Sequence, residues 1–316
     1  MSTRENLLAL NDELRRLKTG GQRTVAVTEE SLEQLRAAVA DCRSGLVPDT
    51  SKATGRAEVT GAVPGLPMAH ESVPVRVAAP LKSAVPGLGE PPPIHLPEGD
   101  KQTRWNALRE LVLKDNVCRA RVCAGKKVVF GVGNLDAAVM FVGEAPGGDE
   151  EEQGEPFVGR AGQLLNRMIT AMGLERSQVY IGNILNWRPE MGVRNADGSQ
   201  TGNRPPTATE MAYCLPFIRA QIGIIQPRVL VALGKTAVDG LLGADRFKSM
   251  GAARGSWHDY ASTPLRASYH PSYLLRQEGL TSASARKIKR DAWEDLLAVM
   301  ARAELPISEK QRNYFL

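Results

Sequence analysis

Three short segments combine side chains that can do chemistry with residues that fix a tight turn. In Gly143-Glu-Ala-Pro-Gly147, the carboxylate of Glu144 follows an apolar run, and the glycines and the proline stiffen the turn around it. Asn183 ends a second apolar run, and His270 stands after a short predicted strand and before Pro271. Carboxylate, amide and imidazole groups serve in acid–base chemistry and directed hydrogen bonding. The segments mark a candidate site, although Asn183 is also a turn former and single histidines are usually structural.

A glycine-flanked loop after the first segment carries an aromatic side chain. An acidic run at 149–152 leads into Gly154-Glu-Pro-Phe-Val-Gly159, where Phe157 would have no core to join. The alternative interpretation is a plain strand-to-helix loop with a solvated acidic run. A phosphate-binding loop would avoid so many carboxylates, and a merely structural turn would not need both Glu144 and Phe157. We therefore expect this loop to belong to the site.

The elements that position these residues alternate between strand and helix beyond Gly99. Apolar patterning predicts strands at 137–142, 178–184 and 228–233, and helices at 101–114, 160–172 and 207–224. Short apolar strands separated by helices indicate an α/β fold with a mostly parallel sheet covered on both faces. Active sites of such sheets lie at the carboxyl ends of the strands, which is where the candidate residues stand.

Composition divides the chain into four parts. Residues 1–43 form a predicted helical segment, whose leucine stripe is either a docking element or ordinary helix packing. Residues 44–99 are rich in Pro, Gly, Ala, Val and Ser, which predicts a disordered linker. Residues 100–303 carry the alternating strands and helices of a predicted catalytic domain. Residues 304–316 form a polar tail.

The bulk properties of the 316-residue chain exclude several classes of protein. A hydrophobic content of 42% suffices for an ordinary core, and no apolar run is long enough to predict a membrane span. The first residues alternate charge with leucine and do not resemble a secretory leader, so we expect a cytoplasmic protein. Four unevenly placed cysteines do not make a secreted disulfide framework. A net charge of +5 permits a polyanionic partner without predicting one.

The motifs together resemble those of the family 4 uracil-DNA glycosylases. The likeness rests on Gly143-Glu-Ala-Pro-Gly147, the spacer to Pro156-Phe-Val-Gly159, Asn183 and His270-Pro-Ser272, and it runs from about 128 to 297. It implies a mostly parallel four-stranded sheet flanked by helices, with a narrow pocket for a flipped base. It also implies hydrolysis of the N-glycosidic bond of uracil in single- or double-stranded DNA, which leaves an abasic site.

The resemblance assigns roles to individual side chains. By analogy, Phe157 stacks on uracil, Asn183 hydrogen-bonds the Watson–Crick edge, and His270 donates to uracil O2. Glu144 positions and polarises the attacking water, and Glu150 is similar to the residue that closes the pocket near C5. Cleavage produces an oxocarbenium-like sugar and a departing uracil anion, so a donor and a carboxylate on opposite sides of the bond stabilise opposite charges.

Further residues are expected to contact the base or the DNA. Gly143 and Ala145 complete the predicted base site. The residues expected to contact DNA are Ser272, Leu274, Arg276, Arg286 and Lys287. Leu274 or its neighbour Leu275 would wedge into the vacated stack, and the basic run at 286–290 would grip phosphate. The alternatives are core leucines and a solvated helix face.

The cysteines depart from the family pattern, in which four cysteines hold an iron–sulfur cluster. Trp187 stands before Arg188-Pro189 where the third ligand is expected, and four residues instead of two separate Cys118 from Cys123. Cys214 alone is placed as in the family. We therefore predict no [4Fe–4S] cluster and no other cofactor, with the space of the cluster refilled by packing.

Two glycine-containing segments resemble nucleotide-binding motifs only in part. Gly131-Val-Gly133 lacks the third glycine of a dinucleotide site, and Gly234-Lys-Thr236 lacks the upstream glycine of a phosphate-binding loop. The alternative functions are a glycosylase for hypoxanthine or xanthine and a uracil-DNA-binding protein without turnover. Intact Glu144, Asn183 and His270 argue against lost turnover. An amide pairs with several base edges, so Asn183 favours uracil only weakly.

The end of the chain has two interpretations. Three apolar side chains, Tyr314, Phe315 and Leu316, follow Gln311 at the end of the polar tail. They either dock on a partner such as a sliding clamp or fold back on their own domain.

Overall fold

The computed structural model describes residues 88–192, 200–278 and 282–315. The predicted helical segment 1–43 and the linker up to residue 87 lie outside the described residues. Among the described residues, no helix is long and apolar enough to cross a membrane.

A six-stranded sheet lies at the centre of the described residues, in the order β1-β3-β2-β4-β6-β5. The four middle strands are parallel, and the two edge strands run antiparallel to their neighbours. The predicted α/β fold with a mostly parallel four-stranded sheet is thus confirmed for the middle of the sheet. The strands are β1 (Val132–Gly133), β2 (Val139–Gly143), β3 (Tyr180–Asn183), β4 (Val229–Leu233), β5 (Trp257–Tyr260) and β6 (Thr263–Ser268).

The edge strands were not predicted because their sequence signals are weak. β1 has only two residues, and β5 alternates between exposed and half-buried positions. The turn between β5 and β6 uses Ala261 at φ 47° and Ser262 at φ 68°, in the left-handed region that glycine or asparagine usually occupies. A hairpin turn without those residues gives no recognisable signal in the sequence.

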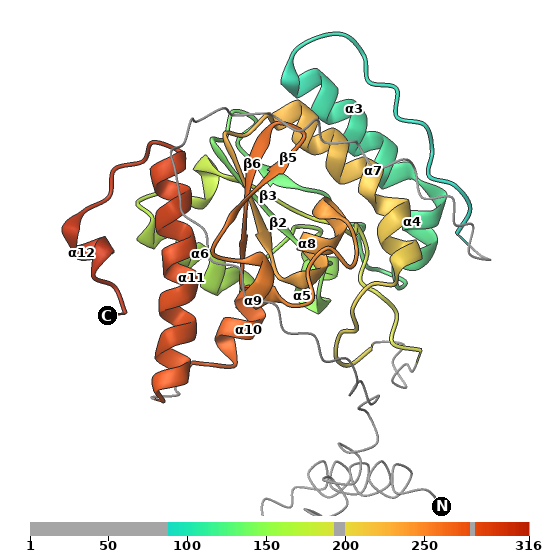
Figure 1. The fold of residues 1–316 in the computed structure, drawn as a ribbon. Coiled ribbons are helices and arrows are strands. Elements are labelled where there is room, and N and C mark those ends of the chain that lie inside the picture. The colour runs from blue at the N-terminus through green and yellow to red at the C-terminus, as the bar shows by residue number, and fades with distance from the viewer. Residues whose placement is uncertain (1–87, 193–199, 279–281, 316) are drawn as a thin grey trace, which may run out of the picture. The chain divides into compact units, whose positions relative to one another are not determined.

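Helices cover both faces of the sheet, and the alternation of side chains along β2 shows why. Met140 and Val142 belong to the core formed with α3, α7 and α8, whereas Val139 and Phe141 face the core formed with α6 and α11. Figure 1 shows α3 and α7 on one side of the sheet and α6 and α11 on the other. The helices of the two covering layers are α3 (Lys101–Lys114), α7 (Ala208–Ile225), α8 (Lys235–Leu242), α6 (Arg160–Ala171) and α11 (Ala283–Arg302).

Shorter helices complete the connections. α5, α8 and α10 follow β2, β4 and β6, so they lie at the carboxyl end of the sheet (Figure 1). The short helices are α4 (Asn116–Arg121), α5 (Gly148–Gln153), α9 (Met250–Ala253), α10 (Pro271–Leu275), α12 (Glu309–Arg312) and the 3-10 turn η1 (Arg176–Gln178).

The domain begins before the predicted boundary at residue 99. Leu88 is buried, and Ile94 and Leu96 pack against the core beneath α3 and α7. The linker prediction for 44–99 is therefore wrong for its last residues. Proline-rich composition concealed the apolar side chains that anchor this stretch to the domain.

The tail folds back on the domain. Trp293 Nε1 on α11 donates to the carbonyl oxygen of Gln311 at 2.6 Å, and the Tyr314 ring lies 5.1 Å from the Trp293 ring. The side chain of Gln311 donates to the carbonyl oxygen of Ala171 on α6. Of the two interpretations of the tail, the structure shows the one in which 304–315 packs on the domain, with Phe315 left 53% exposed.

Candidate active site

The predicted site residues meet at the carboxyl ends of the parallel strands. Gly143 ends β2 and pairs in register with Asn183 at the end of β3. A Cβ atom on Gly143 would lie 2.5 Å from both Asn183 Oδ1 and the Phe157 ring, so these groups close directly on the glycine. The Phe157 ring centroid lies 5.6 Å from that of His270, which follows β6. The structure thus brings four residues from separate motifs together.

Glu144 and Ala145 leave the strand next to this cluster. The backbone carbonyl oxygens of Gly143 and Glu144 accept hydrogen bonds from the amides of Ile184 and Leu185, which continue β3. The Glu144 side chain is half-buried, and its Oε2 accepts a 2.6 Å hydrogen bond from Thr236 Oγ1. Ala145 packs its methyl group against the core. The contact of Ala145 with a base stays a prediction.

The loop that presents Phe157 is held in a strained conformation. Phe157 has φ 54°, a left-handed backbone conformation that is unusual for an aromatic residue. Its carbonyl oxygen accepts a hydrogen bond from Arg176 at 3.1 Å, and a Cβ atom on Gly162 would lie 1.9 Å from the same oxygen. The loop keeps this conformation because α6 and η1 fix it from both sides.

The side chain of Glu150 binds backbone amides of the same loop. One carboxylate oxygen accepts from the amides of Val158 and Gly159 at 3.1 and 3.0 Å, and the other accepts from the amide of Gly147 at 3.0 Å. One oxygen therefore clamps the turn that carries Phe157, and the other caps the start of α5. The place of Glu150 near uracil C5 stays a prediction.

Replacing Glu150 with glutamine is expected to loosen this loop. The amide can accept at only one of its two polar atoms, so at least one buried N–H group loses its partner at a cost of about 1–3 kcal/mol. We expect a lower midpoint of urea unfolding. Glu152→Gln is the matched control, since Glu152 lies on the same helix with an exposed salt bridge to Lys126. Equal unfolding midpoints for the two variants would contradict the clamp.

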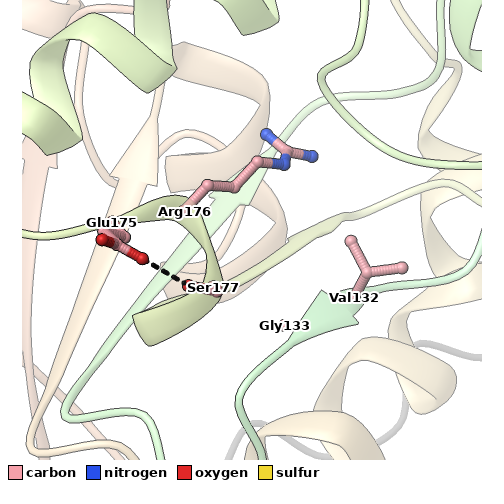
Figure 2. Close-up of a pocket in the computed structure, with 5 residues that line it drawn as sticks. All are labelled: Val132, Gly133, Glu175, Arg176 and Ser177. Carbon is pink, nitrogen blue, oxygen red and sulfur yellow. Dashed lines mark hydrogen bonds between the residues drawn. The ribbon is translucent and has the colours of Figure 1, made fainter.

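Arg176 supports the loop from η1, at the edge of a shallow pocket formed with β1. Figure 2 shows its guanidinium extending away from Glu175 and Ser177, which hydrogen-bond each other at 3.2 Å. The guanidinium also donates to the carbonyl oxygen of Pro156 at 2.6 Å and to Asn166 Oδ1 at 2.9 Å. The cationic side chain of this pocket is thus committed to the Phe157 loop.

His270 presents a neutral ring with a defined tautomer. Its Nδ1 accepts a 3.1 Å hydrogen bond from the amide of Ser272 and lies 2.8 Å from Ser272 Oγ. An Nδ1 that accepts from an amide carries no proton, so the proton of the neutral ring is on Nε2. Burial, reinforced by the charge of Arg276, lowers the pKa of His270 from 6.5 to about 4. The ring therefore offers an uncharged Nε2–H donor at neutral pH.

The low pKa of His270 makes stability depend on pH. Between about pH 4 and 6.5 the unfolded chain binds a proton at this residue that the native state does not. The stability contributed by the neutral ring is present above pH 6.5 and is lost as the pH falls toward 4. A two-dimensional NMR titration should place the His270 midpoint well below that of an ordinary histidine. A midpoint near 6.5 would contradict this burial.

The residues predicted to contact DNA differ in their exposure to solvent. Ser272 is engaged with the His270 ring, so it positions the histidine. Leu274 is 6% exposed, which favours the alternative of a core leucine, whereas Leu275 is half-buried. Insertion of either leucine into DNA stays a prediction. Arg276 is exposed, with its guanidinium 5.5 Å from the Tyr273 ring. Tyr273, itself half-buried, lies 5.1 Å from Tyr269.

The basic run of α11 lies on the surface. Arg286 and Lys287 are both exposed, and Lys287 forms an ion pair with Asp291 at 2.9 Å. Arg286 has no ion pair with any described residue, so it is available to a phosphate, whereas Lys287 would have to leave Asp291 first. This arrangement fits both a phosphate grip and the alternative of a solvated helix face.

A buried ion network lies behind the histidine loop and was missed by the sequence reasoning. Asp295 on α11 is fully buried and bridges Arg254 at 2.8 Å and Arg266 at 3.0 Å. Arg254 also stacks over Tyr269, which precedes His270, at 4.8 Å. The one available signal was an aspartate on the apolar face of a helix, beside Trp293. The network anchors the backbone that carries His270.

The residues at the expected position of the iron–sulfur cluster do not fit that group. Trp187 is 1% exposed and packs edge-on against Tyr213, with 6.1 Å between ring centroids. Cys118 and Cys214 are both buried, and the interaction of the Cys118 thiol with that of Cys214, together with burial, raises the pKa of Cys118. Cluster ligands are four thiolates, whereas here an indole occupies the third position.

The described residues also offer too few ligands for a cluster at this position. Of the four cysteines, Cys42 lies outside the described residues, and no group of three potential metal ligands is found among the residues that the structure describes. Trp187 Nε1 is buried and has no acceptor within the described part of the chain. The absence of a cluster stays a prediction, which an iron assay on the purified protein tests.

Comparison with known proteins agrees with this geometry. Residues 130–297 match the model of the uracil DNA glycosylase superfamily, a span that includes every residue of the central cluster. The chain belongs to the uracil-DNA glycosylase superfamily.

Individual relatives refine this placement. A type-4 uracil-DNA glycosylase of Thermotoga maritima is 39% identical over 170 residues, which cover 54% of this chain and 79% of that protein. A type-4 enzyme of Sulfurisphaera tokodaii is 33% identical, covering 65% of this chain and 89% of the relative. A type-5 uracil-DNA glycosylase of Pyrobaculum aerophilum is 30% identical over 169 residues. Within the superfamily, the chain is placed with the type-4 enzymes.

Proposed function

We propose that this protein removes uracil from DNA by flipping the base and hydrolysing its N-glycosidic bond, which leaves an abasic site without a covalent protein–DNA intermediate. The observation that carries the proposal is the neutral His270 ring, whose Nε2–H donor lies at the same sheet edge as Phe157, Asn183 and Glu144. The similarity to type-4 uracil-DNA glycosylases supports the substrate.

The chemistry follows from the charges that develop as the bond breaks. Uracil departs with negative charge on O2, and a placed donor such as His270 Nε2–H stabilises that charge. The sugar gains positive charge, which the Glu144 carboxylate stabilises while it orients the attacking water. A neutral histidine suits the first task, because it already holds its proton on Nε2 at neutral pH.

Recognition of the base rests on Phe157 and Asn183. The Phe157 ring is already fixed by its loop, so stacking on a base requires little reorganisation. Asn183 Oδ1 is buried and has no hydrogen-bond partner among the described residues. The N3–H group of uracil would satisfy this acceptor. A base that lacks a matching donor would leave it unpaired, whereas another base with an N–H group at this place would also satisfy it, so Asn183 selects for uracil only in part.

Arg276, Arg286 and Lys287 are proposed to hold the DNA backbone. Each phosphate contact releases counterions, so binding of DNA should weaken steeply with salt. Extrusion of the base costs a few kcal/mol and is easiest for single strands and mispaired uracil. The cytoplasmic location stays a prediction.

A panel of labelled oligonucleotides tests the proposed substrate. Single uracil, hypoxanthine, xanthine or thymine residues are placed in the same sequence, and base release is followed under single-turnover conditions. We expect release of uracil at the highest rate and no release of thymine. Faster release of hypoxanthine or xanthine would favour the alternative substrates, and binding of uracil-DNA without any release would favour a protein that has lost turnover.

A second proposal concerns the clamp interaction of the tail. Gln311 and Tyr314 contact the domain, so Phe315 is the apolar side chain that the described tail leaves for a partner. We propose that a sliding clamp would bind here through Phe315 without displacing Tyr314. Phe315→Ala should then weaken binding to an immobilised clamp and leave the unfolding midpoint unchanged. Unchanged clamp binding would remove this proposal.

A further inference from the structure

The segment Gly234-Lys-Thr236 lies between the two proposed catalytic side chains. It follows β4, which pairs with β2 on one side and with β6 on the other. Glu144 follows β2 and His270 follows β6, so the end of β4 separates them at the same sheet edge. The segment lacks part of a phosphate-binding motif. Its place in the sheet instead brings it into contact with both proposed catalytic residues.

Thr236 contacts Glu144 directly. Its Oγ1 donates to Glu144 Oε2 over 2.6 Å, a length typical of a hydroxyl bonded to a carboxylate. Threonine is branched at Cβ, so its own side chain has few conformations and the hydroxyl is held in place by the first turn of α8. A glutamate side chain has three rotatable bonds, and this contact fixes the end that faces the reaction.

Gly234 ties the same segment to the histidine. Its amide donates to the carbonyl oxygen of Ser268, the last residue of β6, at 2.9 Å. Its φ is 89°, and a Cβ atom there would lie 3.0 Å from the Cβ atom of His270. Any other residue would be strained and would crowd the ring. Lys235 is paired with Asp239 one turn further along α8.

We propose that Thr236 is a positioning residue that orients the Glu144 carboxylate for attack of water on the sugar. Gly234 keeps that carboxylate in register with His270, because the same three-residue segment contacts both. This inference rests on the proposed function. It assigns Thr236 no contact with substrate, so its effect reaches the reaction through Glu144 alone.

The test compares Thr236→Val with Thr236→Ser. Valine keeps the shape and removes the hydroxyl, whereas serine keeps the hydroxyl. Misplacement of a catalytic group costs up to about a hundredfold in rate, so we expect Thr236→Val to release uracil about ten- to a hundredfold more slowly in single turnover. Thr236→Ser should recover most of the rate. Affinity for DNA with an abasic site should be unchanged in both variants.

Thr209→Val is the matched control for loss of a threonine hydroxyl. Thr209 is also the second residue of a helix, α7, and is likewise half-buried. It should keep the wild-type rate. A rate for Thr236→Val equal to that of wild type, or an equal loss in both valine variants, would overturn the inference. Thermal unfolding of each variant separates lost positioning from lost folding.

A double-mutant cycle with Glu144→Ala tests whether Thr236 affects the rate of uracil release through Glu144. If Thr236 acts through Glu144, adding Thr236→Val to Glu144→Ala should cause no further loss of rate. Losses that multiply would show that Thr236 acts independently and would overturn the inference, even though uracil release by the wild type stood. Absence of uracil release by the wild type would instead refute the proposed function, and this inference with it.

Discussion

Replacing His270 with alanine is expected to slow uracil release by about a hundred- to a thousandfold, which is the usual cost of removing a placed donor to a developing anion. The variant loses the Nε2–H group, while Phe157 and Asn183 keep their own supports from Arg176 and the sheet. The measurement is the single-turnover rate on an oligonucleotide with one uracil.

His258→Ala is the matched control for this prediction. His258 lies on β5, where its ring contacts Phe247 and the carbonyl oxygen of Ala253 instead of the site. We expect it to keep the wild-type rate. Similar losses of rate in the two variants would mean that His270 contributes only to the fold. That result would contradict the proposal that His270 donates to the departing uracil anion.

Replacing Trp187 with alanine is expected to lower the free energy of unfolding by about 3–5 kcal/mol, as large-to-small changes at fully buried aromatic sites do. The indole is 1% exposed and packs on Tyr213, so alanine leaves a cavity between α7 and the loop after β3. Urea unfolding of the wild type and the variant measures the difference.

Trp187→Phe keeps a ring in the same place and should recover much of this loss. The buried indole N–H has no acceptor among the residues that the structure describes, so its removal should cost little. Unchanged stability of Trp187→Ala would contradict the interpretation that packing fills this position. Stoichiometric iron in the purified wild-type protein would contradict it as well, and would show that the cysteines bind a cluster despite the tryptophan.

The parallel middle of the sheet was predictable because its strands carry a strong signal. β2 and β4 are buried along their whole length, so their residues form apolar runs bounded by glycine. The residues that follow parallel strands share one edge, which predicted that Gly143, Asn183 and His270 would meet. The edge strands and the packed residues from 88 to 99 carry no such pattern.

The roles of individual side chains were harder to predict than the position of the site. Glu150 and Ser272 point to partners within the loops and not outward, a choice that depends on backbone geometry. Leu274 and Leu275 differ in burial although they are neighbours of the same type, because only one faces the core. Thr236 was predictable from its place just after β4, since the same rule had identified Glu144 after β2.

We propose that the cluster around Glu144 and His270 hydrolyses the N-glycosidic bond of uracil in DNA. The most direct test is mass spectrometry of the products formed by the full chain from an oligonucleotide with one uracil, with a parallel reaction in borohydride. We expect equal amounts of free uracil and an intact strand with one abasic site, and no trapped protein–DNA adduct. Uracil-DNA recovered unchanged would contradict this proposal, as would a trapped adduct.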